Sequence, residues 1–308
     1  YGVNCEDNES GRPWAEALIV RHLAARGSNF RCEGGLNDYL KAHNITGIEN
    51  IDTRAVTRIL RKQGTMNGMI TCAEECDLDA VLVQLKQYRV SGTVERVSIQ
   101  EKEFYPGAKG GSGYKIALYD FGEKRNMTRC LNKRGCDVTV YPCHTPAQEV
   151  LDGGFDGLML SNGPGNPADC VEIIEELKKL YASDLPIFAV CLGHQLMALA
   201  TGAQTGPLPY GHRGANHPVR DLTRKRVYIT SQNHGYYVMK ETVDPAVAKV
   251  EHENVNDGTC EGLSYVGKNI FTVQFHPEAS PGPVDSDYLF DEFMDMIALA
   301  KKGGIRNA

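Results

Sequence analysis

A cysteine at the junction of an apolar run and a helical pattern is the strongest candidate for a reactive group. The segment Pro186-Ile-Phe-Ala-Val-Cys191-Leu-Gly-His-Gln195 predicts a buried strand, a sharp turn at Cys191 and a helix. Such a turn lifts one side chain above a sheet, and the small residues Ala189 and Gly193 let backbone and helix approach closely. The helix N-terminus favours a thiolate, and the N–H of Leu192 is placed to donate to an oxyanion. We therefore predict that Cys191 is a nucleophile, although an arbitrary cysteine is more often a buried apolar residue.

A base for this nucleophile follows a second apolar strand near the other end of the chain. The segment Phe271-Thr-Val-Gln-Phe-His-Pro-Glu278 places His276 and Glu278 two residues apart, with proline restricting the backbone between them. A nucleophilic cysteine needs a proton shuttle, and an imidazole needs a group that orients it. On its own a His-x-Glu sequence is weak evidence, because surface pairs of this kind are common. Combined with the predicted turn at Cys191, it indicates a Cys-His-Glu triad.

A stiff loop is the third element. Ser161-Asn-Gly-Pro-Gly-Asn-Pro167 follows a short apolar run, and its two glycines, Gly163 and Gly165, alternate with prolines. Backbone N–H groups in such a loop can supply a second oxyanion donor or hold a substrate amide or carboxylate. Taken alone, the loop is equally consistent with an ordinary tight turn.

The order and spacing of these three motifs resemble those of the class I (triad) glutamine amidotransferases. The resemblance covers residues 114–300 and implies that Cys191 attacks the side-chain amide of L-glutamine to form a γ-glutamyl thioester. It also implies that His276 protonates the departing ammonia and then activates water, while Glu278 orients the imidazole of His276. Asn233-His-Gly-Tyr236 matches a further substrate-binding loop of the family. The implied glutamine-binding and oxyanion positions are Gly163, Gly165, Leu192, Gln195, Asn233, Gly235 and Tyr236. Ala189 departs from the family, which often has glycine there, but alanine is small enough that we expect activity to be retained.

The rest of the chain is similar to one branch of this family, the small subunits of carbamoyl phosphate synthetase. The similarity is carried by Ser28–Arg31, Tyr39–Ile45, Ile51–Leu60, Asp120–Asn126, Gly211–Pro218 and the extended tail His276–Pro283. It implies a large-subunit partner that uses ATP, Mg and bicarbonate, receives ammonia through a tunnel and makes carbamoyl phosphate for arginine and pyrimidine synthesis. We therefore expect a heterodimer or an oligomer of heterodimers, with no cofactor in this chain, which has no P-loop. The family domain extends further toward the N-terminus and supplies a glutamine-contacting serine, so we expect the N-terminal domain here to be incomplete.

Three alternatives remain open at this point. The chain could be the glutaminase part of anthranilate, GMP or CTP synthesis, although the front of the chain and the tail after Glu278 count against this. It could be a free cysteine hydrolase of the same fold, which would ignore ATP and bicarbonate. A regulatory protein without chemistry is the third alternative, and the presence of Cys191, His276 and Glu278 counts against it.

Alternating strand and helix patterns predict the scaffold that positions these motifs. Strands are expected at 115–119, 137–141, 157–160, 186–190, 226–230, 262–265 and 270–275, and helices at 125–134, 171–181, 192–201 and 287–301. This alternation predicts an α/β fold with a mostly parallel sheet flanked by helices. The glycine-dense run Tyr105–Gly113 is interpreted as a flexible linker. It divides a smaller α+β domain at 1–113 from an amidotransferase domain at 114–308.

Composition excludes several other classes of function. A formal net charge of -6 argues against a nucleic-acid partner, and the sequence has no apolar run long enough to span a bilayer. The ten cysteines are scattered without a C-x-x-C pair, which favours reduced thiols in a cytoplasmic protein. His212 and His217 could be imagined as metal ligands, but no third ligand is spaced to join them. We therefore expect structural roles for both and no metal site.

Overall fold

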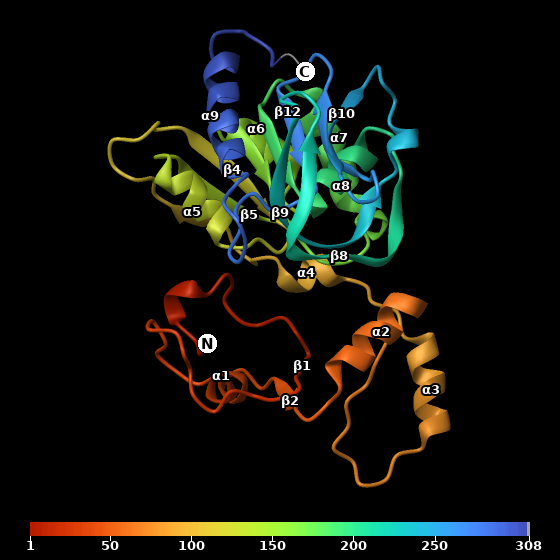
Figure 1. Cartoon of the computed structure of the whole chain (residues 1–308). Helices are drawn as coiled ribbons and strands as arrows, with labels where there is room; N and C mark the ends of the chain where they lie inside the picture. Colours follow the sequence, from red (N-terminus) through yellow and green to blue (C-terminus); the bar gives the residue numbers. More distant parts are fainter. Residues whose placement is uncertain (307–308) are drawn as a thin grey trace. The chain divides into compact units, whose positions relative to one another are not determined.

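The computed structural model describes residues 1–306, which form two compact units, Tyr1–Val90 and a larger unit from Ser91 onward (Figure 1). The division falls earlier than the predicted boundary at 113. Residues 91–113 belong with the second unit because Val94, in helix α4 (Thr93–Val97), is buried in its core. Strand β3 (Glu103–Tyr105) also pairs with β5 (Asp137–Pro142) of that unit.

The glycine-dense run is packed rather than acting as a linker between the units. The N–H of Gly113 donates to the carbonyl of Gly135 at 3.1 Å, and the N–H of Ser112 donates to Arg134 at 3.0 Å. A Cβ at Gly111 would lie 2.3 Å from the Cα of Gly135, so two glycine backbones meet here. The glycines therefore permit a close backbone contact, which their composition alone does not distinguish from flexibility.

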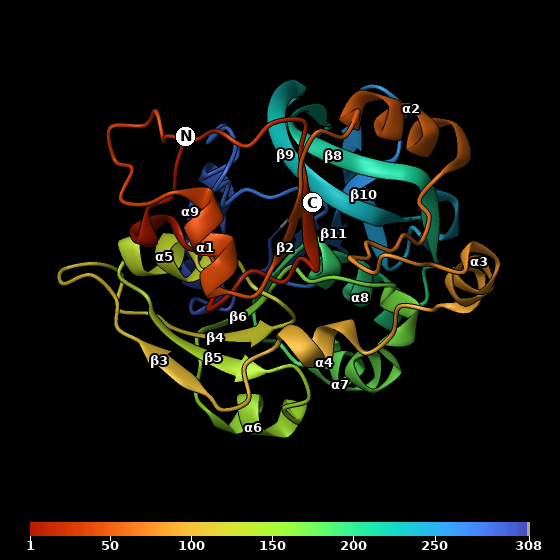
Figure 2. The same ribbon diagram turned by 90° about the horizontal axis from the view of Figure 1, so that it is seen from below.

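The second unit is built on one ten-stranded sheet in the order β3-β5-β4-β6-β7-β12-β11-β10-β8-β9. Its central strands β5, β4, β6, β7 and β12 are parallel, as predicted, and the remaining pairs are antiparallel. The parallel strands after β5 are β4 (Lys115–Asp120), β6 (Gly157–Leu160), β7 (Ile187–Val190) and β12 (Ile270–Val273). The antiparallel extension consists of β11 (Cys260–Tyr265), β10 (Ala248–Asn254), β8 (Thr205–Asp221) and β9 (Arg226–Val238), and Figure 2 shows it at the opposite end of the sheet from β3.

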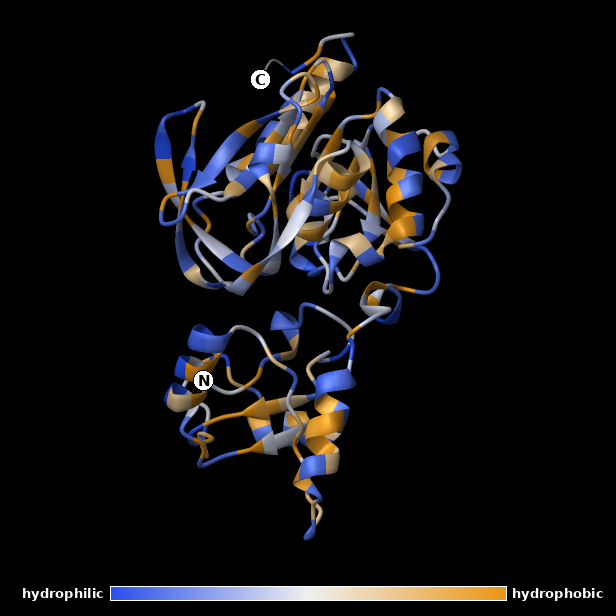
Figure 3. Ribbon diagram, turned by 90° about the vertical axis from the view of Figure 1, so that its right-hand side faces the viewer, coloured by the Kyte–Doolittle hydropathy of each residue, from blue (hydrophilic) through white to orange (hydrophobic). Residues whose placement is uncertain are grey.

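Helices cover both faces of this sheet. The sheet separates the core into two clusters of buried residues, one under each layer of helices. One cluster contains residues of α6 (Ala147–Asp152), α7 (Val171–Ala182) and α8 (Leu192–Ala200). The other contains residues of α5 (Asn126–Lys133) and α9 (Tyr288–Ala300). The helices carry both hydrophobic and hydrophilic stretches, as Figure 3 shows, and their apolar residues face the strands. The prediction of an α/β fold with helices on both faces is confirmed.

The first unit has much less internal packing. A short parallel pair, β1 (Ala17–Ile19) and β2 (Thr46–Ile48), accompanies α1 (Leu36–Ala42), α2 (Thr53–Gln63) and α3 (Leu78–Gln87). None of the side chains in residues 1–90 is fully buried. Within the described residues, no helix is both long enough and apolar enough to cross a membrane.

Candidate active site

The candidate site lies where four parallel strands end. Cys191 follows β7, Ser161 follows β6, and His276 comes shortly after β12. Lys124 lies beyond the end of β4, the strand between β5 and β6. Open α/β sheets bind ligands at the carboxyl ends of their strands because the loops there converge from both faces. The fold therefore gathers segments that are up to about 150 residues apart in the sequence.

Cys191 occupies a strained turn between β7 and α8. Its φ of 53° and ψ of -103° lie outside the regions that non-glycine residues normally adopt. The turn is held because the N–H of Cys191 donates to Val273 at 2.8 Å and its carbonyl accepts from Gln195 at 3.2 Å. Strain that the surrounding structure maintains is typical of functional sites. This geometry is the nucleophile elbow expected from the sequence.

Close packing around the elbow explains its small residues. A Cβ at Gly193 would lie 2.6 Å from the carbonyl oxygen of Leu160, which is closer than side-chain atoms approach. Ala189 is fully buried on β7, between partners on β6 and β12, so its methyl group is accommodated within the sheet. The departure from the family's glycine at this position therefore leaves the strand intact.

His276 and Glu278 form a buried pair. Nδ1 of His276 lies 2.7 Å from Oε1 of Glu278, and the two side chains are 5% and 0% exposed. Burial alone would lower the pKa of His276, but the charges of Glu278 and Cys191 raise it to about 9. Nε2 makes no hydrogen bond of ordinary geometry to the described residues, yet the Cys191 side chain is close enough to influence the imidazole. Glu278 thus orients the ring so that Nε2 remains available for proton transfer.

Lys124 joins this pair, and sequence reasoning did not assign it a role. Its Nζ lies 2.8 Å from the same Glu278 oxygen that contacts His276, and it also donates to the carbonyl of Ala279. Burial alone would raise the pKa of Glu278, but His276 and Lys124 together lower it. The only sequence signal was the family-like segment Asp120–Asn126, which gives no indication of a partner more than 150 residues away.

The loop after β6 is fixed by contacts with the end of β4. Ser161 Oγ accepts from the N–H of Phe121 at 2.9 Å, and Asn162 donates to the carbonyl of Gly122 at 2.9 Å. A Cβ at Gly163 would lie 2.2 Å from the carbonyl oxygen of Phe121, and Gly165 has a φ of 98°. Both glycines are therefore required by the backbone path.

Two backbone donors are free near the elbow. Among the described residues, no hydrogen bond takes up the N–H of Leu192 or that of Gly163. Leu192 is the first residue of α8, where the N–H groups have no partner within the helix. A site that stabilises an oxyanion needs donors of this kind, already oriented and not otherwise bonded.

The other predicted substrate-binding residues cluster on α8 and β9. The side chain of Gln195 donates to the carbonyl of Tyr236 at 2.7 Å and to Gln274 at 2.8 Å. Asn233 is exposed and accepts from Arg213 at 2.6 Å. Gly235 lies between Asn233 and Tyr236 in the chain and is half-buried. The structure therefore brings Gln195 to Tyr236, whereas the side chain of Asn233 is occupied by Arg213.

His194, for which we predicted packing or hydrogen bonding, is fully buried with Nδ1 2.7 Å from Thr272 Oγ1. Burial lowers its pKa to about 3, so the ring is neutral. It lies on α8 beside the nucleophile but belongs to the core.

The chain that carries this strained elbow and His-Glu pair belongs to the class I glutamine amidotransferases. The family model for glutamine amidotransferase class-I matches residues 117–296. A solved structure from Thermoplasma acidophilum, described as part of a GMP synthase, has a similar fold, with a TM-score of 0.55 and 22% identity over 62% of this chain and 96% of its own.

The chain belongs more specifically to the carbamoyl phosphate synthase small chain family. The model for the CPSase domain of that small chain matches residues 1–70. The carbamoyl phosphate synthase small chain of Bacillus cereus is 48% identical over 304 residues, which span 99% of this chain and 82% of the relative. That of Clostridium perfringens is 48% identical over 96% of this chain and 82% of its own length. The family-level prediction is confirmed.

Proposed function

We propose that this chain hydrolyses L-glutamine to glutamate and ammonia and passes the ammonia to the large subunit of carbamoyl phosphate synthase. The observation that carries the proposal is the strained Cys191 beside a buried imidazole whose Nδ1 is held 2.7 Å from Glu278. Membership of the small chain family supports the identity of the partner.

The reaction divides into two half-reactions. The sulfur of Cys191 attacks the side-chain carbonyl carbon of glutamine, and the resulting oxyanion accepts from the N–H groups of Leu192 and Gly163. The thiol proton of Cys191 passes to Nε2 of His276 as the sulfur attacks, and His276 then gives this proton to the nitrogen as the C–N bond breaks, which releases ammonia and leaves a γ-glutamyl thioester. Water attacks this thioester as His276 takes one of its protons, and the same proton then passes to the departing sulfur, so that glutamate leaves and the thiol is restored. Gln195, Asn233 and Tyr236 are proposed to hold the glutamine.

The remaining chemistry belongs to the partner under this proposal. The large subunit binds ATP and Mg, activates bicarbonate and combines it with ammonia into carbamoyl phosphate, so this chain needs no cofactor for its own step. The assembly is a heterodimer or an oligomer of heterodimers in the cytoplasm, and it supplies arginine and pyrimidine synthesis. The alternative assignment to anthranilate, GMP or CTP synthesis is disfavoured because residues 1–70 match the small chain domain.

Glutamate release from glutamine tests the proposal. The chain is assayed alone and then with the large subunit of carbamoyl phosphate synthase, ATP, Mg and bicarbonate, with Cys191→Ala as the control. We expect weak release alone, a large increase in the full mixture and loss in the variant. Release that is unchanged by the partner and nucleotide would indicate a free hydrolase instead.

A further inference from the structure

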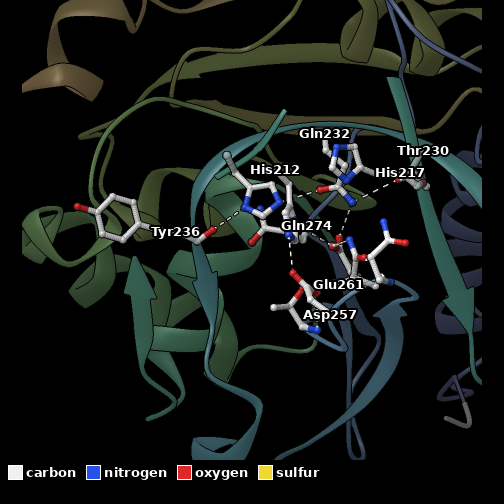
Figure 4. Close-up of polar contacts among 12 residues, drawn as sticks. His212, His217, Thr230, Gln232, Tyr236, Asp257, Glu261 and Gln274 are labelled. Carbon is white, nitrogen blue, oxygen red and sulfur yellow. Dashed lines mark hydrogen bonds and ion pairs between the residues drawn. The ribbon is translucent and has the colours of Figure 1, made fainter. Parts of the chain in front are cut away.

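A second cluster of chemically competent side chains lies in the antiparallel part of the sheet. His212 on β8, His234 on β9 and Glu261 on β11 each offer a ligand atom, and these atoms lie within 4.8 Å of one another. All three side chains are buried. Figure 4 shows His212 and Glu261 converging with Gln232 and Asp257. None of these residues takes part in the bond-forming steps proposed above.

Both imidazoles have their second ring nitrogen fixed by an oxygen acceptor. Nε2 of His212 lies 2.8 Å from Oδ2 of Asp257, and Nδ1 of His234 lies 2.7 Å from the carbonyl oxygen of Tyr236. Histidines that bind metal ions almost always donate their other N–H to a carboxylate or a backbone carbonyl, which sets the tautomer and the ring orientation. The nitrogens left to face the cluster are Nδ1 of His212 and Nε2 of His234.

The nitrogen of His212 that faces the cluster makes no hydrogen bond of ordinary geometry to the described residues. This Nδ1 is buried and lies 3.5 Å from Oε1 of Glu261. Glu261 is fully buried, and apart from this ion-pair contact with His212 its two oxygens accept from the neutral amides of Asn254 and Gln232, each at 2.9 Å. A buried carboxylate is stable only when a positive charge compensates it.

The hydrogen-bond pattern around His234 is one donor short. Its Nδ1 faces the carbonyl oxygen of Tyr236, while its Nε2 lies 2.7 Å from Oε1 of Gln232. A neutral imidazole carries one N–H, so a neutral His234 can donate to only one of these two oxygens. Reversing the Gln232 amide only moves the conflict, because its oxygen would then face the carboxylate of Glu261. A cation on Nε2 of His234 removes this deficit.

We propose that His212 Nδ1, His234 Nε2 and the Glu261 carboxylate form a binding site for a divalent transition-metal ion such as Zn²⁺. Two imidazoles and one carboxylate suit zinc and its neighbours, whereas calcium and magnesium prefer all-oxygen ligands. Ligand atoms of a tetrahedral zinc ion are about 3.4 Å apart, so the spacing here, which is at most 4.8 Å, has to close by up to about 1.4 Å as the Gln232 side chain turns aside. The bound ion would join β8, β9 and β11 directly behind Tyr236, whose carbonyl accepts from Gln195.

This proposal replaces the expectation that the chain has no metal site. His212 and His217 were considered as ligands from the sequence, but the other two ligands lie on different strands and show no recognisable spacing. His217 is not a member of the cluster, although its ring centroid lies 5.3 Å from that of His212.

Metal titration of the whole chain tests the site directly. The reactive and exposed thiols are first alkylated, which removes Cys191 and the exposed cysteines as competing ligands, and the protein is freed of metal with a chelator. Zn²⁺ binding is then measured by calorimetry and Co²⁺ binding by visible absorption. We expect one saturable equivalent of each ion, with cobalt d–d bands and no sulfur charge-transfer band.

Matched variants decide whether these residues are the ligands. We expect His212→Gln and Glu261→Gln to abolish binding of the single metal equivalent. Asp257→Asn removes only the carboxylate that contacts Nε2 of His212, and it should weaken metal binding roughly 10–100-fold. His144→Gln, at an exposed histidine, should leave the affinity unchanged. The far-ultraviolet dichroism of each variant is compared with the parent to confirm folding. Absence of saturable binding to the parent chain, or equal affinity in folded Glu261→Gln, would overturn the proposal.

Discussion

The ammonium group of Lys124 lies 2.8 Å from Oε1 of Glu278, the same oxygen that lies 2.7 Å from Nδ1 of His276. One buried carboxylate oxygen is therefore shared by two cationic groups that are far apart in the sequence but adjacent in the fold. Because Glu278 has no exposed side-chain surface, its charge depends on both partners. Lys124 acts on the proposed triad through Glu278 and is a positioning residue.

Replacing Lys124 by methionine should destabilise the chain by about 2–3 kcal/mol at neutral pH, because it leaves the Glu278 carboxylate with one partner fewer. Glu278 has a lowered pKa, so its stabilising contribution is present above the ordinary value of 4.5 and is lost as the pH falls through the folded value. The difference between variant and parent should therefore shrink below about pH 4.5. Urea unfolding of both proteins between neutral and acidic pH measures this difference in stability.

Lys102→Met provides a matched control, because Lys102 pairs with Glu149 at 3.4 Å on the surface. Such a pair contributes at most about 1 kcal/mol. Equal losses in the two variants, or a Lys124→Met effect that persists at acidic pH, would show that Lys124 does not stabilise the Glu278 charge.

Glu278→Gln should lower the pKa of His276 from about 9, because burial then acts on the imidazole without the opposing carboxylate. In the parent chain this raised pKa contributes stability that is fully present below pH 6.5 and is lost as the pH rises through the folded value. The variant should lose that dependence on alkaline pH. Histidine NMR titration measures the pKa, with Glu149→Gln as a surface control. An unchanged pKa of His276 in the variant would rule out Glu278 as the cause of the raised pKa.

His194→Gln should flatten the loss of stability in mild acid. Burial lowers the pKa of His194 to about 3, so the unfolded chain binds a proton that the folded chain does not. Stability from this group is complete above about pH 6.5 and falls by up to about 1.4 kcal/mol per pH unit below it. Thermal unfolding at several mildly acidic pH values compares the slopes. Identical slopes for parent and variant would mean that His194 is already protonated when folded.

Gly193→Ala should disrupt the elbow, because the added methyl group would lie 2.6 Å from the Leu160 carbonyl oxygen. We expect a loss of roughly 1–3 kcal/mol and reduced alkylation of Cys191 by iodoacetamide. Gly68→Ala, where no atom lies within 4 Å of the new methyl, should be nearly neutral. Unaltered stability and labelling in Gly193→Ala would show that the helix can move aside without cost.

The sequence predicted the parallel core because each of its strands is a short apolar run between turn residues. Strand β7 (Ile187–Val190) and strand β6 (Gly157–Leu160) were located within a residue of their observed bounds. The residues of the proposed triad were selected for the same reason, since Cys191, His276 and Glu278 all follow such strands in the sequence.

The longest strand was not predicted. Strand β8 (Thr205–Asp221) contains Pro207, Pro209 and several glycines, residues that normally mark loops. It pairs with β9 through two register shifts, one between Pro207 and His212 and another between Gly214 and His217. These irregularities accommodate the strand breakers, and they follow from the partner strand rather than from local sequence.

Contacts between distant segments account for the other omissions. Lys124 and Glu278 are 154 residues apart, and the cluster of His212, His234 and Glu261 draws one residue from each of three strands. Neither set has a characteristic spacing, so the fold had to be known before the pairing could be seen. The packed glycines at Tyr105–Gly113 show the same limit, because their partner is the turn at Gly135.

The covalent intermediate on Cys191 tests the central claim most directly. The chain is mixed with the large subunit, glutamine, ATP, Mg and bicarbonate, quenched in acid during turnover, and analysed by peptide mass spectrometry. We expect the peptide containing Cys191 to carry one γ-glutamyl group, absent when glutamine is omitted and absent in Cys191→Ala. Steady glutamate release by the parent with no adduct on Cys191, together with undiminished release by Cys191→Ala, would contradict glutamine hydrolysis through this cysteine.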